Sequence, residues 1–171
     1  AAYIKNVASS EIYPNWPEAA LRANILAQIS YALNRVYTEY YRSRGYDFDI
    51  TSSTQFDQKF IPNRDIFENI SRIVDDIFND YVVKQGTIQP YFTQYCNGTT
   101  STCAGLSQWG TVDLARQGLV PYEILQRYYG NDINIDSVFY SQICTRNRGI
   151  EKLYVSEAFK APIYKLVYEL I

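Results

Sequence analysis

A stripe of apolar residues that recurs every three or four positions after residue 17 is the strongest pattern in the chain. Its members are Leu21, Ile25, Ile29, Ala32, Val36 and Tyr40. This spacing predicts a helix with one buried face. Polar residues fall mostly off that face; they are Arg22, Asn34, Arg35 and Arg42. Pro17 suits the first helical turn, and we expect the helix to run toward Tyr41 and to end before Gly45.

A second apolar stripe, between Pro62 and Gly86, predicts another long helix. Its members are Ile66, Ile70, Ile73, Ile77 and Tyr81. Acidic residues fall on the opposite side; they are Glu68, Asp75, Asp76 and Asp80. This distribution is typical of a solvated helix face and needs no functional explanation.

Shorter elements complete the predicted fold. Alternation of apolar and polar residues predicts short strands at residues 47–50 and 87–95, and Pro90 favours a sheet edge for the second. The segments GLSQWGTVDLARQG and VPYEILQRYYG predict two short helices, the first of which ends at Gly118. The predicted fold class is therefore α+β, a helix-dominated single domain with two long helices and a small sheet.

Composition limits the classes of partner. The chain has 171 residues, 47% of them hydrophobic, which is enough for one sizeable core. A formal net charge of −2 disfavours nucleic acid, and no apolar run is long enough for a membrane span. The 17 Tyr residues suit a surface that binds flat polar ligands such as sugars, although tyrosines at the edge of a core explain them equally well.

The absence of histidine limits the chemistry. Without His the chain has no Ser-His-Asp or Cys-His catalytic arrangement and no His-containing zinc site. Cys96 and Cys103 are too far apart for a CxxC motif, but in an exported chain they are candidates for a disulfide. Cys144 is expected to be an inert, buried thiol. We therefore expect neither a metal nor a cofactor.

Two separated motifs resemble the SpoIID/LytB family, the stage II sporulation protein D and amidase-enhancer proteins of Gram-positive cell walls. YIKNVASSEIYPNWPEAALRANILAQISYAL is similar to the opening pattern of the family, YLxxVxxxEM followed by WPxEALKAQAxAARTY. GLSQWGTVDLARQGLVPYEILQRYYG is similar to its closing pattern. The resemblance implies a SpoIID/LytB-like domain over residues 3–130. Residues 131–171, with a possible strand and a helix near Pro162, are then an extension that packs on this domain or leads to a further module.

The resemblance implies peptidoglycan as the ligand and Glu11 as the catalytic acid. Stage II sporulation protein D is a lytic transglycosylase, which cleaves glycan strands that have lost their stem peptides. A hydrolysing glycosidase usually needs two carboxylates about 5 to 9.5 Å apart. A lytic transglycosylase needs one, because the C6 hydroxyl of the sugar is the nucleophile. The resemblance also implies an exported protein of the cell wall or spore envelope of a Gram-positive bacterium.

Five residues are candidates for substrate binding: Tyr13, Trp16, Gln58, Ser107 and Gln108. Tyr13 and Trp16 lie next to Glu11 in the sequence and offer an apolar setting that would raise the pKa of its carboxyl group. Each assignment has a structural alternative. Ser107 and Gln108 are equally suited to capping the helix at Trp109. An acid just before a helix is often only a partner of the helix dipole, an interaction of roughly 0.3–1 kcal/mol.

Several positions depart from the family pattern. Asn24 and Ile29 stand where the family has Gln and Arg, and the loss of Arg removes a potential partner of a carboxylate. Some members carry a zinc-linked His or Cys before a Gln-x-Tyr, whereas this chain reads Asp57-Gln58-Lys59-Phe60. These departures favour an alternative function, a non-catalytic protein that binds peptidoglycan or enhances a cell-wall amidase.

Overall fold

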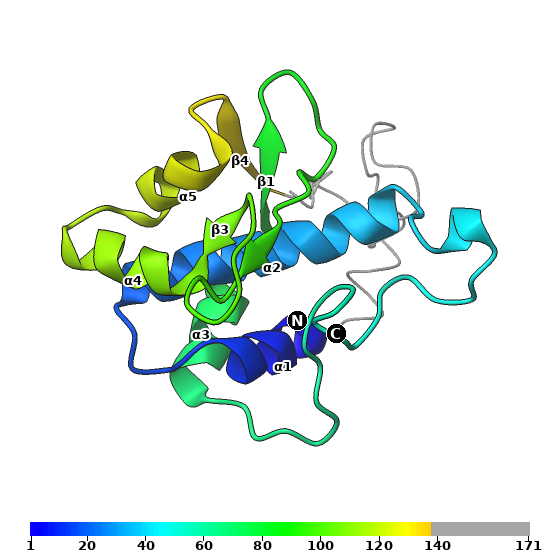
Figure 1. The fold of residues 1–171 in the computed structure, drawn as a ribbon, viewed down its shortest axis with the longest axis horizontal. Helices are drawn as coiled ribbons and strands as arrows, with labels where there is room; N and C mark the ends of the chain where they lie inside the picture. Colours follow the sequence, from blue (N-terminus) through cyan, green and yellow to red (C-terminus); the bar gives the residue numbers. More distant parts are fainter. Residues whose placement is uncertain (138–171) are drawn as a thin grey trace, which may run out of the picture.

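The computed structural model describes residues 1–137, and its central element is helix α2 (Glu18–Tyr37). In Figure 1, α2 runs through the middle of the molecule, with α1 and α3 on one side and α4, α5 and β1 on the other. The predicted stripe is buried from Leu21 to Val36. Asn34 and Arg35 are buried as well, contrary to the prediction, because α2 is covered on nearly all sides and both side chains find polar partners.

Helix α1 (Ala2–Glu11) precedes α2 and was not predicted from the sequence. Ile4, Val7 and Ala8 bury one side of it, and the helix contacts both α2 and α3. Glu11 is its last residue, so it lies at the end of a helix and not on the loop that leads into α2. The segment that follows, with Trp16 buried, leads directly into α2.

The second predicted helix is shorter than expected. Helix α3 (Glu68–Ile77) is followed by strand β1 (Asp80–Lys84), which contains Tyr81. Tyr-Val-Val is a favourable strand sequence, and all three residues are buried there. Strand β4 (Ile133–Ser137) pairs with β1 in antiparallel register, with Val82 opposite Ile135.

A second small sheet consists of β2 (Tyr95–Cys96) and β3 (Leu106–Ser107), which run parallel. The strand predicted over residues 87–95 is therefore mostly absent, and Pro90 forms only an isolated antiparallel bridge with Val83. Residues 47–50 form no strand but follow a short 3₁₀ helix, η1 (Arg42–Arg44), in a segment of turns.

Two short helices, α4 (Gln108–Arg116) and α5 (Pro121–Tyr129), confirm the predictions for this part of the chain. Gly118 between them has a φ of +92°, which favours glycine. The fold is α+β, as predicted. Cys144 and the possible helix near Pro162 lie outside the described residues.

Within residues 1–137, no helix combines the length and apolarity needed to span a bilayer. The same part of the chain has no group of three or more His, Cys, Asp or Glu side chains that would suit a metal ion.

Candidate functional site

Glu11 lies at the end of α1, where its carboxyl group meets α2 and the segment after Asp57. The side chain of Gln28 on α2 donates a hydrogen bond from Nε2 to Glu11 Oε2, at 2.9 Å. The backbone N–H of Lys59 donates to Glu11 Oε1, at 2.8 Å. Tyr95 of β2 lies beside the same carboxyl group. Three segments distant in sequence thus converge on one acid.

Burial raises the pKa of Glu11 to about 7. The Lys59 N–H, the neighbouring Tyr95 hydroxyl, Gln28 and the Lys59 charge oppose this rise only in part. No Lys or Arg forms an ion pair with Glu11 among the described residues. The residue as a whole keeps partial access to solvent. Glu11 is therefore a largely enclosed acid, about half protonated near neutral pH.

Gln58 is fully buried next to this acid but does not bond to it. Its Oε1 accepts a hydrogen bond from the Tyr3 hydroxyl at 3.1 Å, and its Nε2 donates to the backbone carbonyl of Gln28 at 3.0 Å. Gln58 thus fixes the backbone of Gln28, the residue that contacts Glu11. Its arrangement supports a positioning role rather than direct contact with a ligand.

The segment that carries Gln58 and Lys59 is anchored by Asp57. Asp57 Oδ1 accepts from Arg35 Nε at 2.8 Å and from the Tyr31 hydroxyl at 3.1 Å. Its Oδ2 accepts from the Tyr41 hydroxyl at 2.6 Å and from the N–H and hydroxyl of Thr51, both at 2.9 Å. Burial alone would raise the pKa of Asp57, but these hydrogen bonds hold it below its usual value. The segment is therefore tied to α2 at an ionised carboxylate.

Three aromatic rings form a cluster next to the end of α1. The ring centroids of Trp16 and Trp109 are 4.8 Å apart, and Tyr13 lies 5.7 Å from each of them. Trp16 is buried, Trp109 is half-buried and Tyr13 is 55% exposed. The cluster joins the two sequence motifs, and only Tyr13 presents much of its ring to solvent.

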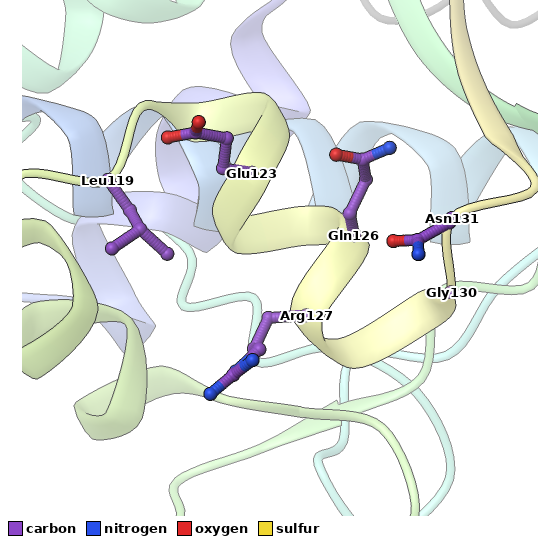
Figure 2. A pocket seen from close by; sticks show the side chains of 6 residues that line it. All are labelled: Leu119, Glu123, Gln126, Arg127, Gly130 and Asn131. Carbon is purple, nitrogen blue, oxygen red and sulfur yellow. The ribbon is translucent and has the colours of Figure 1, made fainter.

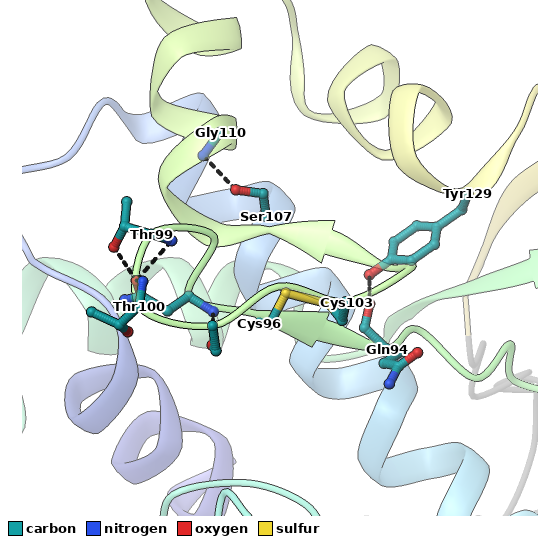
Figure 3. Close-up of a disulfide and its surroundings, with 10 residues drawn as sticks. Gln94, Cys96, Thr99, Thr100, Cys103, Ser107, Gly110 and Tyr129 are labelled. Atoms are coloured by element: carbon teal, nitrogen blue, oxygen red, sulfur yellow. Dashed lines mark hydrogen bonds between the residues drawn. A yellow bond between two sulfur atoms is a disulfide. The ribbon is translucent and has the colours of Figure 1, made fainter.

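Ser107 and Gln108 lie at the start of α4, and both form hydrogen bonds within its first turn. Ser107 Oγ accepts a hydrogen bond from the N–H of Gly110 at 3.0 Å and so caps the helix (Figure 3). Gln108 is buried at the first position of the helix, and its backbone carbonyl accepts a hydrogen bond from the Thr111 hydroxyl. Neither side chain forms a hydrogen bond with Glu11.

A disulfide between Cys96 and Cys103 closes the loop that precedes β3 (Figure 3). Inside the loop, the carbonyl of Asn97 accepts a hydrogen bond from the N–H of Trp109 at 3.1 Å. A Cβ added to Gly98 would meet Ser107 Oγ at 1.9 Å, so this position admits only glycine in such close packing. The loop thus packs against the start of α4 and follows Tyr95 directly.

Two cavities lie away from Glu11. A shallow one of about 470 Å³ is formed along α5 by Leu119, Glu123, Gln126, Arg127, Gly130 and Asn131 (Figure 2). Another, of about 340 Å³, is lined by residues of β1 and the chain after it together with Asn34. Neither is bordered by a candidate site residue from the sequence.

Sequence reasoning did not find Gln28, Lys59 or Tyr95 as neighbours of Glu11. Gln28 directly precedes Ile29, the position where the family pattern has Arg, and Ile29 points into the core at 2% exposure. A polar residue next to the position of the missing Arg could have indicated that Gln28 is a partner of Glu11. Lys59 contributes a backbone N–H, which residue type does not reveal.

The comparisons with known proteins gave one match. Residues 1–76 match the model of the family described as the stage II sporulation protein, SpoIID. No curated protein and no solved structure matches the chain.

Proposed function

We propose that this protein is a lytic transglycosylase that cleaves peptidoglycan strands free of stem peptides. The match of residues 1–76 to the SpoIID family supports a sporulation-related role at the cell wall. The observation that carries the proposal is the environment of Glu11. It is an enclosed carboxyl group with neutral hydrogen-bond partners and a pKa of about 7. Such a group can donate and accept a proton near neutral pH.

The proposed reaction uses Glu11 twice. In its protonated form the carboxyl group donates its proton to the glycosidic oxygen, and the bond between that oxygen and the anomeric carbon breaks. The carboxylate then takes the proton of the C6 hydroxyl, whose oxygen bonds to the anomeric carbon and forms a 1,6-anhydro ring. The acid ends protonated and no water is consumed, so one carboxyl group suffices.

The state of Asp57, the only Asp or Glu that is buried as a whole residue within residues 1–137, supports a mechanism with a single carboxylate. Asp57 accepts five hydrogen bonds and forms an ion pair with Arg35, so its oxygens are already occupied. A two-carboxylate hydrolase needs a second acid that is free to activate water or attack the sugar. Asp57 is poorly suited to that role.

The aromatic cluster supports a saccharide as the ligand. Tyr13 offers an exposed ring two residues from Glu11, backed by Trp16 and Trp109. Aromatic faces combine apolar contact with a hydroxyl or N–H at the edge, which suits the mixed surface of a sugar. In this proposal the glycan strand lies over Tyr13, and the protein is exported to the cell wall or spore envelope.

Product analysis tests the proposal directly. The purified protein is incubated with stem-free glycan strands, and the products are examined by mass spectrometry for 1,6-anhydro ends. We expect such ends with the wild type and a loss of at least about a hundredfold in rate for Glu11→Gln, since general acid catalysis contributes on that order. Glu18→Gln, which changes an exposed glutamate on α2, is the matched control.

The pH dependence gives a second readout of the same experiment. The first step needs protonated Glu11, so the rate should fall about tenfold per pH unit above the pKa of about 7. Absence of anhydro ends from every wild-type digest, with a known transglycosylase active on the same strands, would refute the enzymatic proposal.

A second candidate function is a non-catalytic one, binding of peptidoglycan or enhancement of a cell-wall amidase. The burial of Ile29 favours it, because the position of the family Arg supplies no cation beside Glu11. In that case the protein would sediment with stem-free glycan, or would accelerate amidase release of stem peptides, and Glu11→Gln would do so equally well.

A further inference from the structure

Buried polar atoms without hydrogen-bond partners gather at Glu11. Among the described residues, three buried side-chain atoms lack a partner: Gln28 Oε1, Tyr95 Oη and Arg64 Nε. Two of the three belong to residues that lie against the Glu11 carboxyl group. Folded proteins rarely leave such atoms unpaired, because each loses its hydrogen bonds to water without replacement. Two at one acid indicate that another group completes the site.

As the side chains lie, neither atom has a hydrogen-bond partner among the described residues. Turning the Gln28 amide over would direct Oε1 to Glu11, but it would leave Nε2 unpaired instead, so one amide atom stays open in either orientation. The Tyr95 hydroxyl lies near Glu11 and Gln58 and interacts with both electrostatically, but no group of the described residues meets it at hydrogen-bond distance and angle.

The chemistry of the two open atoms defines the missing group. A side-chain carbonyl only accepts hydrogen bonds, whereas a tyrosine hydroxyl donates and accepts. An anion has no hydrogen for Gln28 and would be repelled by ionised Glu11, and an ammonium group has no lone pair for the Tyr95 O–H. An alcohol satisfies both atoms, since it donates to Gln28 Oε1 and accepts from Tyr95 Oη.

We propose that Gln28 Oε1 and Tyr95 Oη together bind a hydroxyl group of the glycan next to the Glu11 carboxyl group. The inference rests on the proposed function and adds to it the residues that hold this hydroxyl. In the proposed reaction the primary C6 hydroxyl must approach both Glu11 and the anomeric carbon. Gln28 and Tyr95 would align its oxygen for attack while Glu11 takes its proton.

Binding measurements on a non-cleaving background test this inference. In Glu11→Gln, titration calorimetry with stem-free glycan strands gives a reference affinity, and Tyr95→Phe is then added to remove only the hydroxyl. We expect about tenfold weaker binding, as for the loss of one hydrogen bond in an enclosed site. Tyr91→Phe is the matched control, because the Tyr91 ring packs on Tyr129 and not on Glu11.

Removing the primary hydroxyl from the ligand tests whether this is the group that Gln28 and Tyr95 bind. An oligosaccharide that lacks primary hydroxyls (6-deoxy) should bind with equal affinity to the proteins with and without the Tyr95 hydroxyl. Thermal unfolding supplies a further readout. Because Tyr95 Oη has no partner in the protein, Tyr95→Phe alone should keep or raise the melting temperature.

The outcomes separate the two proposals. If stem-free glycan binds and is cleaved but Tyr95→Phe changes neither affinity nor its dependence on the primary hydroxyl, the two atoms hold only a water molecule, and this inference is wrong while the transglycosylase remains. If the wild type yields no anhydro ends, the proposed function fails. A lower melting temperature for Tyr95→Phe would also contradict the inference, since it would assign the hydroxyl a partner in the folded protein.

Discussion

At the scale of single residues, the neutral partners of Glu11 have an energetic cost. A buried carboxylate is usually compensated by a cation, as Asp57 is by Arg35. Glu11 has an amide and a backbone N–H instead, so its ionised form remains unfavourable and its pKa rises to about 7. Ionised Glu11 therefore lowers the free energy of unfolding near neutral pH, where the proposed acid catalysis takes place.

A pH series on Glu11→Gln measures this cost. The pKa is about 7 in the folded protein and 4.5 in the unfolded one, so the folded state binds an extra proton between these values. Wild-type stability should be highest below pH 4.5, fall by roughly 3 kcal/mol as pH rises to 7, and stay level above it as far as this group is concerned. Glu11→Gln has no titratable group at this position and lacks this pH-dependent loss of stability. Its melting temperature relative to wild type should therefore increase from pH 4.5 to pH 8, and a constant difference would contradict the raised pKa.

The sequence motif identified Glu11 but not the groups that set its pKa. The motif before Trp16-Pro17 was enough to single out the acid. Gln28 and Tyr95 lie 17 and 84 positions further along the chain, and no local pattern links them to position 11. Their proximity arises from the packing of α1, α2 and β2, which periodicity does not encode.

At the scale of elements, the start of α4 is held by a single hydroxyl. Ser107 Oγ accepts the N–H of Gly110, and Gly98 of the disulfide loop packs against that serine. Capping serines satisfy one of the free N–H groups of the first helical turn. The same helix carries Trp109, so the cap also supports the aromatic cluster.

Ser107→Ala should lower the free energy of unfolding by about 1 kcal/mol, within the range of 0.5–2 kcal/mol for lost helix caps. Chemical denaturation measures the change, with Ser71→Ala inside α3 as a serine control that caps nothing. A loss of glycan binding in Ser107→Ala at temperatures where the protein is fully folded would instead assign Ser107 a contact with the ligand.

The elements were predicted well where one apolar face sets the pattern, as in α2, α4 and α5. The error at Tyr81–Val83 has a physical cause, since a continuous apolar run fits a helix face and a buried strand equally well. Strand β1 is settled by its partner β4, which lies some 50 positions away in the sequence. Helix α1 was not predicted, because its apolar stripe is short and consists of Ile4, Val7 and Ala8 alone.

At the scale of the whole molecule, one buried ion pair connects the far end of α2 to the candidate site. Arg35 and Asp57 are almost fully enclosed, and Asp57 precedes by two residues the N–H that binds Glu11. Tyr40 lies under the guanidinium of Arg35 at 3.8 Å and helps to enclose the pair. The position of Lys59 thus depends on contacts made near the C-terminal end of α2.

Asp57→Asn should therefore affect stability and the site together. Removing one partner of a buried pair leaves an unpaired charge on Arg35, and we expect a loss of about 3–5 kcal/mol in the free energy of unfolding. Under conditions where the variant is folded, its pH–rate profile should shift as well, because the Lys59 N–H no longer holds Glu11 in place. Asp75→Asn, which breaks the exposed pair with Lys5, is the control and should change little. An unshifted profile for Asp57→Asn would mean that Lys59 keeps its place without this anchor.

The covalent ring between Cys96 and Cys103 bears on how the protein is prepared. The ring follows Tyr95 without a break, and through Asn97 it also fastens the backbone of Trp109. In protein purified from a reducing cytoplasm, Cys96 and Cys103 would be free thiols. The loop between them would then be less constrained, and so would Tyr95 and Trp109, which it holds in place. Production by secretion, or oxidative refolding, is accordingly the route that yields the shape described above.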